Sequence, residues 1–226
     1  MRLPLILVNF KCYKEATGNN ALKLAKICKT VSKEYKVNIA IAPQYTDIFR
    51  ITSKLRIEVF GQHIDTVDPG AHTGHITALS LKKARVIGSL INHSERRLSL
   101  REINECIRQT KKHDLISIVC SDSIMKVKNI AMFEPDFIAY EPPELIGTGV
   151  SVSKTKPRVV SETVKIIKRV NPEIKVLCGA GITDGEDVRK ALELGTVGVL
   201  VASGVVKKYS PKEILTEFAK AVKSYE

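Results

Sequence analysis

Short apolar runs alternate with amphipathic segments along the whole chain. Each run has the length of a β-strand and is apolar at successive positions, not only at every second one, which is typical of parallel strands covered on both faces. Eight such runs predict strands at residues 5–10, 38–42, 58–62, 86–91, 115–120, 137–140, 175–178 and 197–201.

A segment with helical character follows each apolar run. Pro157 and Pro211 stand at first-turn positions, and Asp184 opens another helix, so several helix starts carry explicit signals. The predicted helices cover residues 21–34, 45–53, 80–83, 100–113, 123–132, 157–170, 184–194 and 211–225, the third of them the weakest.

Eight strand-helix units in 226 residues give about 28 residues per unit, close to the lower size limit of a closed barrel. No linker or low-complexity tract interrupts the alternation. We therefore predict an α/β fold with a single (β/α)8 barrel as one catalytic domain, residues 1–226. A doubly wound open sheet is the alternative, because counting strands does not show whether a sheet closes.

Composition favours an ordinary globular protein, with 44% hydrophobic and 27% charged residues. The net charge of +12 suggests an anionic partner. Basic residues are spread along the chain among acidic ones and aromatics are only 5%, so the sequence offers no stacking platform for nucleic acid. A solvated basic surface that attracts a phosphorylated metabolite is the favoured interpretation.

Five cysteines form no Cys-x-x-Cys pair, and their odd number favours a reduced, cytoplasmic compartment. The apolar stretch at the N-terminus is too short for a signal peptide and is interpreted as the first strand. No later run approaches the length of a membrane span.

Catalytic groups of a barrel lie at the C-terminal ends of its strands. Lys11 follows the first predicted strand, His93 the fourth and Glu141 the sixth. Taken singly, they are compatible with a surface charge, a helix cap and a loop carboxylate. Together they predict proton transfer next to a carbonyl, with a carboxylate base, a neutral hydrogen-bond donor and a stabilising cation.

Small-residue turns follow the last three predicted strands: Ile146-Gly147-Thr148-Gly149, Gly179-Ala180-Gly181 and Ala202-Ser203-Gly204. Backbone N–H groups in such turns can approach phosphate oxygens closely, and barrels commonly hold phosphate after strands seven and eight. Any one of them is also compatible with a plain tight turn.

The chain resembles the triosephosphate isomerase family in its short, archaeal form. The resemblance covers essentially the whole chain. It is carried by four segments in the family's order, Val8-Asn9-Phe10-Lys11, Asn92-His93-Ser94-Glu95-Arg96-Arg97, Tyr140-Glu141-Pro142-Pro143 and Ile146-Gly147-Thr148-Gly149.

The resemblance implies interconversion of dihydroxyacetone phosphate and D-glyceraldehyde 3-phosphate through an enediolate, in glycolysis and gluconeogenesis, without a cofactor. It implies that Glu141 is the base, that His93, kept neutral by a helix N-terminus, polarises the carbonyl, and that Lys11 stabilises negative charge. Asn9 and Glu95 complete the site. Residues 142–151 look like the family's lid. The implied phosphate contacts are Asn9, Lys11, Ile146, Gly147, Gly181, Ala202 and Ser203.

Three positions depart from the common family pattern: Phe10 replaces a usual Trp, Gly181 a frequent Ser and Ala202 a frequent Gly. The segment Gly70-Ala71-His72-Thr73-Gly74-His75 is similar to the loop that family members insert into a neighbouring subunit. The resemblance thus implies a homodimer at least, with a homotetramer as the fuller assembly.

Two other functions, one enzymatic and one non-catalytic, remain open at this point. A barrel lyase or synthase for another phosphorylated metabolite would share the phosphate turns but not the base, and a non-catalytic binding protein would use only the basic charge. A metal site at His72 and His75, with Asp65 and Asp68 nearby, fits no defined ligand spacing, so none is predicted.

Overall fold

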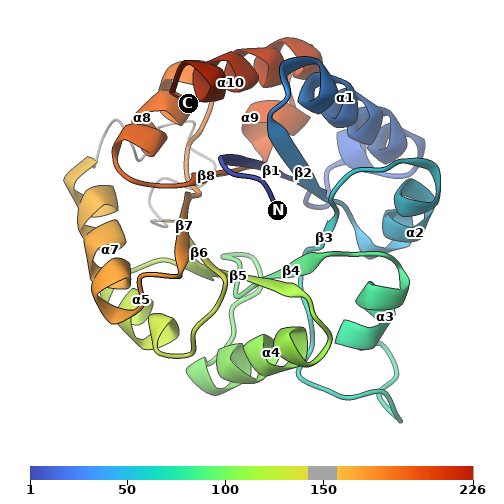
Figure 1. Ribbon diagram of the computed structural model, residues 1–226. Helices are drawn as coiled ribbons and strands as arrows, with labels where there is room; N and C mark the ends of the chain where they lie inside the picture. Colours follow the sequence, from blue (N-terminus) through green and yellow to red (C-terminus); the bar gives the residue numbers. More distant parts are fainter. Residues whose placement is uncertain (142–156, 226) are drawn as a thin grey trace.

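A ring of parallel strands, surrounded by helices, forms the framework of the molecule (Figure 1). The computed structural model describes residues 1–141 and 157–225. The strands are β1 (Leu5–Asn9), β2 (Asn38–Ala42), β3 (Phe60–Gly61), β4 (Gly88–Ile91), β5 (Ile116–Ser121), β6 (Phe137–Tyr140), β7 (Lys175–Cys178) and β8 (Gly198–Val201).

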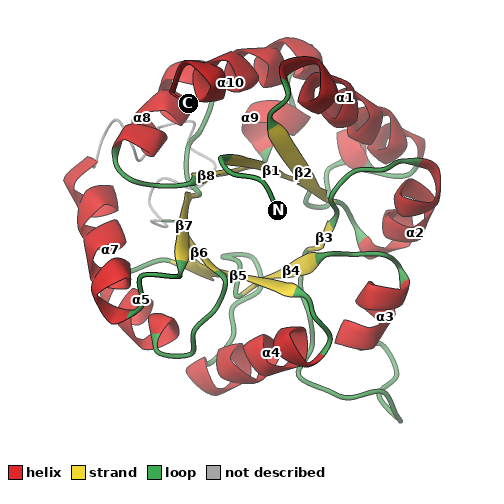
Figure 2. Cartoon of the chain, in the orientation of Figure 1, coloured by secondary structure: helices red, strands yellow, loops and turns green. Residues whose placement is uncertain are grey.

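The helices lie on the outside of this ring (Figure 2). They are η1 (Lys14–Ala16), α1 (Asn19–Tyr35), α2 (Tyr45–Lys54), α3 (Ala78–Lys83), α4 (Leu100–Lys112), α5 (Ile124–Ala131), α7 (Pro157–Val170), α8 (Gly185–Glu193), α9 (Ser203–Val206) and α10 (Pro211–Tyr225). None of the helices in the described part of the chain is long and apolar enough to cross a membrane.

The sheet closes on itself. Its eight strands run in the order β2-β1-β8-β7-β6-β5-β4-β3, every pair parallel. The two ends of this order meet where Ile41 forms a parallel bridge with Val59 and its N–H donates to the Glu58 carbonyl at 3.1 Å. The (β/α)8 barrel prediction is therefore confirmed, and the open doubly wound sheet is excluded.

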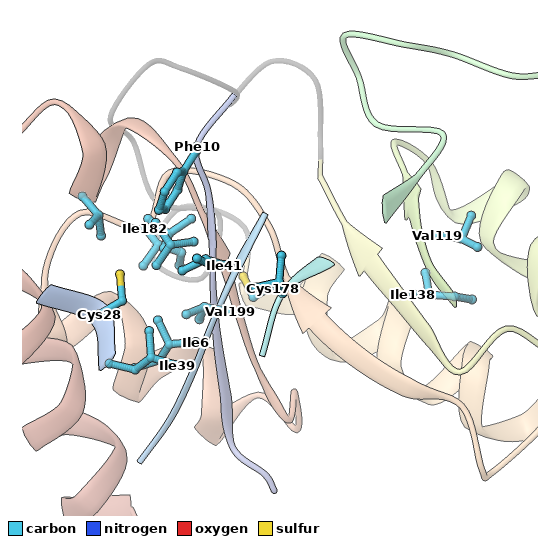
Figure 3. Packing of buried hydrophobic residues seen from close by; sticks show 14 of the residues in the cluster. Ile6, Phe10, Cys28, Ile39, Ile41, Val119, Ile138, Cys178, Ile182 and Val199 are labelled. Atoms are coloured by element: carbon cyan, nitrogen blue, oxygen red, sulfur yellow. The ribbon is translucent and has the colours of Figure 1, made fainter. Parts of the chain in front are cut away.

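Side chains alternate between two apolar layers, as a strand period of two requires. Leu5 and Leu7 of β1 point into the barrel, whereas Ile6 and Val8 point out toward the helices. Figure 3 shows Ile6 and its partner on β2, Ile39, on the side that faces Cys28 of α1. Both layers are fully enclosed, which explains why the strands are apolar at successive positions.

Phe60 is a fully buried member of the apolar layer inside the barrel, beside β4. A Cβ placed on Gly88 would lie 2.5 Å from the Phe60 ring, so the ring occupies the space that this glycine leaves. We predict that Phe60→Ala lowers the free energy of unfolding by about 3–5 kcal/mol, because it leaves a cavity. The control is Phe49→Ala, since Phe49 is 62% exposed. Urea denaturation of both variants measures this, and equal losses would contradict the packing described.

Most predicted element bounds agree with the structure, including β2, β6, β7, α7 and α10. Two differences stand out. The third strand pairs only at Phe60–Gly61, shorter than the predicted 58–62. The short helices η1 and α9 were not predicted, because three or four residues are too few to display a helical period.

Candidate active site

Three predicted catalytic side chains meet at the C-terminal rim of the barrel. Lys11 lies two residues beyond β1, His93 two residues beyond β4, and Glu141 directly follows β6. His93 Nε2 lies 3.6 Å from Glu141 Oε1. These side chains line one pocket, together with Asn9 and the small-residue turns after β7 and β8.

The backbone at Lys11 is held in an uncommon conformation. Its φ is +46°, and its N–H donates to Asn9 Oδ1 at 3.0 Å. Gln62 Nε2 donates to the carbonyls of Lys11 and Ala42, each at 3.0 Å. At the other end of the side chain, Lys11 Nζ pairs with Glu95 Oε1 at 2.9 Å. The ammonium is thus fixed at the pocket from both ends, and Asn9 and Glu95 act as its immediate supports.

Gln62 is a site residue that the sequence analysis did not select. It follows the third strand, so the strand-end rule that selected Lys11 also covered this position. Gln62 is the last residue of the predicted third strand, 58–62, and an uncharged amide there does not itself indicate acid-base chemistry. Its side chain joins the carbonyl of Lys11, in the loop after β1, to that of Ala42 at the end of β2.

His93 presents one ring nitrogen to the protein and the other to the pocket. The Glu95 N–H donates to His93 Nδ1 at 3.2 Å, so Nδ1 is the acceptor and the ring proton is on Nε2, facing Glu141. The donor belongs to a turn, because α4 does not begin until Leu100. The resemblance implied that a helix N-terminus keeps this ring neutral, whereas the group that hydrogen-bonds Nδ1 is the backbone N–H of a turn residue, Glu95.

Asn92 holds the turn that carries His93. Its φ is +60°, a conformation that Asn tolerates better than most residues. Its side chain donates to the Cys120 carbonyl and accepts from the Leu98 N–H, both at 2.8 Å. Arg97 Nη1 donates to the Asn92 carbonyl at 3.2 Å. The His93 ring is therefore anchored to β5 as well as to its own loop.

Glu141 is a buried carboxylate, with only 3% of the residue exposed. Burial raises the pKa of Glu141, and the neighbouring His93, the Cys120 thiol, Lys11 and Arg97 oppose this to a smaller extent. Among the described residues, no group hydrogen-bonds Oε2. The carboxylate is thus poorly solvated and faces the pocket, as a strong general base should be.

A pH dependence follows from the raised pKa of Glu141. A base works only when deprotonated, so kcat/KM falls as pH drops through this pKa. We predict an acidic limb above the ordinary glutamate value of about 4.3. Initial rates of triose phosphate isomerisation between about pH 4 and pH 9 measure the limb. A limb at or below the ordinary value would contradict the assignment of Glu141 as a desolvated base.

Gly179 leaves the space that Glu141 occupies. A Cβ on Gly179 would lie 2.5 Å from Glu141 Cγ, closer than real carbon atoms approach. We predict that Gly179→Ala displaces the carboxylate and lowers kcat by about 100-fold. Steady-state kinetics and thermal unfolding of the same preparation separate the two effects, because displacement lowers kcat in protein that is still folded. A folded variant with wild-type kcat would contradict this role.

The turns after β7 and β8 also line the pocket. Gly181 has φ +69°, which favours glycine, and it lines the pocket with Ala202 and Ser203. A Cβ on Gly204 would lie 2.2 Å from the Ile182 carbonyl, so only glycine lets the two turns touch. The predicted phosphate contacts Ile146 and Gly147, and the whole predicted lid at residues 142–151, lie outside the described residues.

The four residues weighed as metal ligands have other neighbours. His72 and His75 pack edge to face with ring centroids 5.8 Å apart. Asp65 contacts His63 and Arg96, and Asp68 pairs with Lys112 at 2.7 Å. In residues 1–141 and 157–225, no three His, Cys, Asp or Glu side chains are grouped as a metal site requires.

The chain is similar to known proteins over nearly its full length. The family model for triosephosphate isomerase matches residues 4–222. Triosephosphate isomerase of Methanothermus fervidus is 51% identical over 217 residues, which cover 96% of this chain and 98% of that one. Those of Methanocaldococcus jannaschii and Methanosarcina barkeri are 49% and 47% identical, over 96% and 98% of this chain and 100% of theirs. These relatives have the short form that the sequence resembled, and the chain therefore belongs to the triosephosphate isomerase family.

Proposed function

We propose that Glu141, His93 and Lys11 carry out the reaction of this family, the interconversion of dihydroxyacetone phosphate and D-glyceraldehyde 3-phosphate in glycolysis and gluconeogenesis. The proposal rests on one observation: a desolvated carboxylate and the Nε2 of a fixed imidazole, 3.6 Å apart, face the same pocket. The proposed catalytic unit is the single domain of residues 1–226.

In the proposed mechanism, Glu141 removes a proton from the carbon next to the substrate carbonyl. The electron pair of that bond moves toward the carbonyl oxygen and generates an enediolate, while His93 Nε2–H donates to the oxygen. The Lys11 ammonium stabilises the negative charge. His93 Nε2 then gives its proton to that carbonyl oxygen and takes the hydroxyl proton of the deprotonated carbon, which moves the negative charge to the second oxygen. The protonated Glu141 delivers its proton to the former carbonyl carbon, and the second oxygen becomes the new carbonyl. Glu95 keeps Lys11 and His93 in position, and Asn9 adds a polar contact.

The phosphate group is proposed to lie against Gly181, Ala202 and Ser203, with further contacts from Asn9 and Lys11. By family resemblance, the backbones of Ile146 and Gly147 would close over it as part of the lid. Closure would exclude water, which otherwise lets the enediolate lose its phosphate. No cofactor takes part in this mechanism.

The experiment is a coupled assay with each triose phosphate as substrate. The proposal expects saturable turnover in both directions. The alternative of a barrel lyase or synthase, which would share the phosphate turns but not the base, expects no triose phosphate turnover. Purified, folded protein that binds phosphate esters but does not turn over triose phosphates would overturn the proposal in favour of that alternative.

We further propose that the chain works as a homo-oligomer, a dimer at least and by resemblance a tetramer. The loop from Gly70 to His75 is exposed and is held at its base by two hydrogen bonds between Asp65 and Ile76. A second pocket, lined by Lys11, Tyr45 and Glu95, opens beside the first, and we propose that it receives this loop from a neighbouring subunit. Sedimentation equilibrium tests this, with Thr73→Arg expected to dissociate the assembly. A fully active wild-type monomer would overturn it.

A cytoplasmic site of action is part of the same proposal. All five cysteines are free, and Cys28, Cys106, Cys120 and Cys178 are buried. Unpaired thiols persist where the compartment is reducing. Small phosphorylated sugars as substrates agree with the same compartment.

A further inference from the structure

A lysine that the proposed mechanism does not use, Lys207, lies over the ring of Tyr13, which lines the active-site pocket. Tyr13 lines the pocket from the loop after β1, and Lys207 directly follows α9 in the loop after β8. Because β1 and β8 are paired, with Val8 opposite Val201, these two loops are neighbours at the rim. Lys207 Nζ lies 4.4 Å from the centroid of the Tyr13 ring.

The face of an aromatic ring attracts a cation at this distance, so Tyr13 gives Lys207 a preferred position. Lys207 itself is exposed, and Tyr13 is half-buried. A long lysine side chain in water would otherwise sample many rotamers. The ring therefore holds the ammonium beside the pocket instead of leaving it to solvent.

The two lysines near this pocket differ in how far their charge is compensated. Lys11 Nζ is paired with Glu95 at 2.9 Å, so the positive charge of the lysine that lines the pocket is already partly neutralised. In the part of the chain that the structure describes, no carboxylate lies within ion-pair distance of Lys207. The rim consequently carries a positive charge that is free to interact with an incoming anion.

We propose that Lys207, oriented by Tyr13, is a specificity-determining residue that attracts the phosphate dianion of the substrate. This inference rests on the proposed function, since it concerns the substrate of that same site. A phosphate monoester carries about −1.5 to −2 charges near pH 7, whereas the unphosphorylated triose carries none. A charge at the rim acts on substrate capture more than on the chemical step, and dissolved salt screens it.

The test compares Lys207→Gln with Lys208→Gln, its exposed neighbour with the same formal charge change. For an ammonium and a phosphate separated by roughly 8 Å of water, we expect kcat/KM for glyceraldehyde 3-phosphate to fall about five-fold in Lys207→Gln at low ionic strength. Lys208→Gln should change it less than two-fold. The difference should disappear near 1 M salt, where the screening length is about 3 Å.

Three further measurements distinguish attraction of phosphate from a structural effect. The inhibition constant of inorganic phosphate should rise in Lys207→Gln by a factor similar to the loss in kcat/KM. Turnover of unphosphorylated glyceraldehyde should not change. In a Tyr13→Leu background, Lys207→Gln should have a smaller effect than in the wild type, because the ring no longer holds the ammonium at the rim.

Equal behaviour of the two glutamine variants would overturn the inference, as would a loss that persists in high salt or extends to glyceraldehyde. Failure of the proposed function would give a different set of results from failure of this inference. In that case the wild type does not isomerise triose phosphates, whereas calorimetric titration with inorganic phosphate still reports whether Lys207→Gln weakens anion binding relative to Lys208→Gln.

Discussion

Shortening Glu141 to Asp is expected to lower kcat for triose phosphate isomerisation by about 100-fold or more, with little change in KM. The carboxylate would withdraw from the pocket by about one methylene, and a displacement near 1 Å costs about this much in a proton transfer. Glu141→Gln keeps the shape but removes the base, so we expect a loss of about 10²–10⁴-fold. A coupled spectrophotometric assay measures both variants.

The matched control is Glu213→Asp, which makes the same change at an exposed position on α10. Its kcat should equal that of the wild type. Thermal unfolding should show that the Glu141 variants remain folded. Because the wild-type carboxylate is buried, Glu141→Gln also removes a desolvated charge, and its stability should not fall. Turnover by Glu141→Gln within a few-fold of the wild type would remove Glu141 from the mechanism.

His93→Asn is expected to lower kcat by about 10²–10³-fold, the usual loss when a preorganised donor to a developing oxyanion is removed. The Asn carbonyl can take the place of Nδ1 and still accept the Glu95 N–H, which donates to it at 3.2 Å in the wild type. The donor at the position of Nε2 is lost. The turn should therefore keep its conformation while the pocket loses its neutral acid.

His93→Gln is the comparison, because its longer side chain can carry an N–H close to the former Nε2 position. We expect it to retain more activity than His93→Asn, and steady-state kinetics of both variants measure the difference. Equal activity of His93→Asn and the wild type would show that the imidazole does not polarise the carbonyl. Equal losses in both variants accompanied by unfolding would indicate a packing role for this buried ring instead.

The barrel could be predicted from the sequence because its strands are buried on both faces and recur at regular intervals. Patterning alone left the closed barrel and the open sheet as alternatives, because closure depends on the contact between Ile41 and Val59, which is a single bridge. Local patterning carries no information about a bridge between two ends of a sheet. The third strand pairs only at Phe60–Gly61, and local patterning does not show this either, because the length of a strand depends on its pairing with its neighbours.

Lys11, His93 and Glu141 could be predicted because each is a titratable residue at a strand end, where a barrel gathers its functional groups. The supports of these residues were harder to identify. Gln62 acts by joining two backbone carbonyls. Gly179 acts by having no side chain, which leaves room for Glu141. Both roles depend on packing between segments distant in sequence, so they cannot be predicted from the residue type alone.

The hydrogen-bond donor to His93 Nδ1 also could not be predicted from the sequence. The family resemblance implies a helix N-terminus at His93, whereas the helix starts at Leu100, as the sequence pattern predicts, and a turn fixed by Asn92 precedes it. Glu95 is therefore both the residue whose carboxylate holds Lys11 and the one whose N–H holds the imidazole. Backbone geometry decides this, and a positive φ at Asn92 is part of it.

Solvent deuterium exchange tests directly whether Glu141 removes a carbon-bound proton. Dihydroxyacetone phosphate is incubated with enzyme in D2O, and the carbon-bound hydrogens of both triose phosphates are followed by proton NMR. A carboxylate that takes up a proton exchanges it with solvent, so wild type should yield product containing deuterium at carbon, and Glu141→Gln should add none above the enzyme-free rate. Isomerisation with complete retention of protium, or undiminished exchange in Glu141→Gln, would contradict this mechanism.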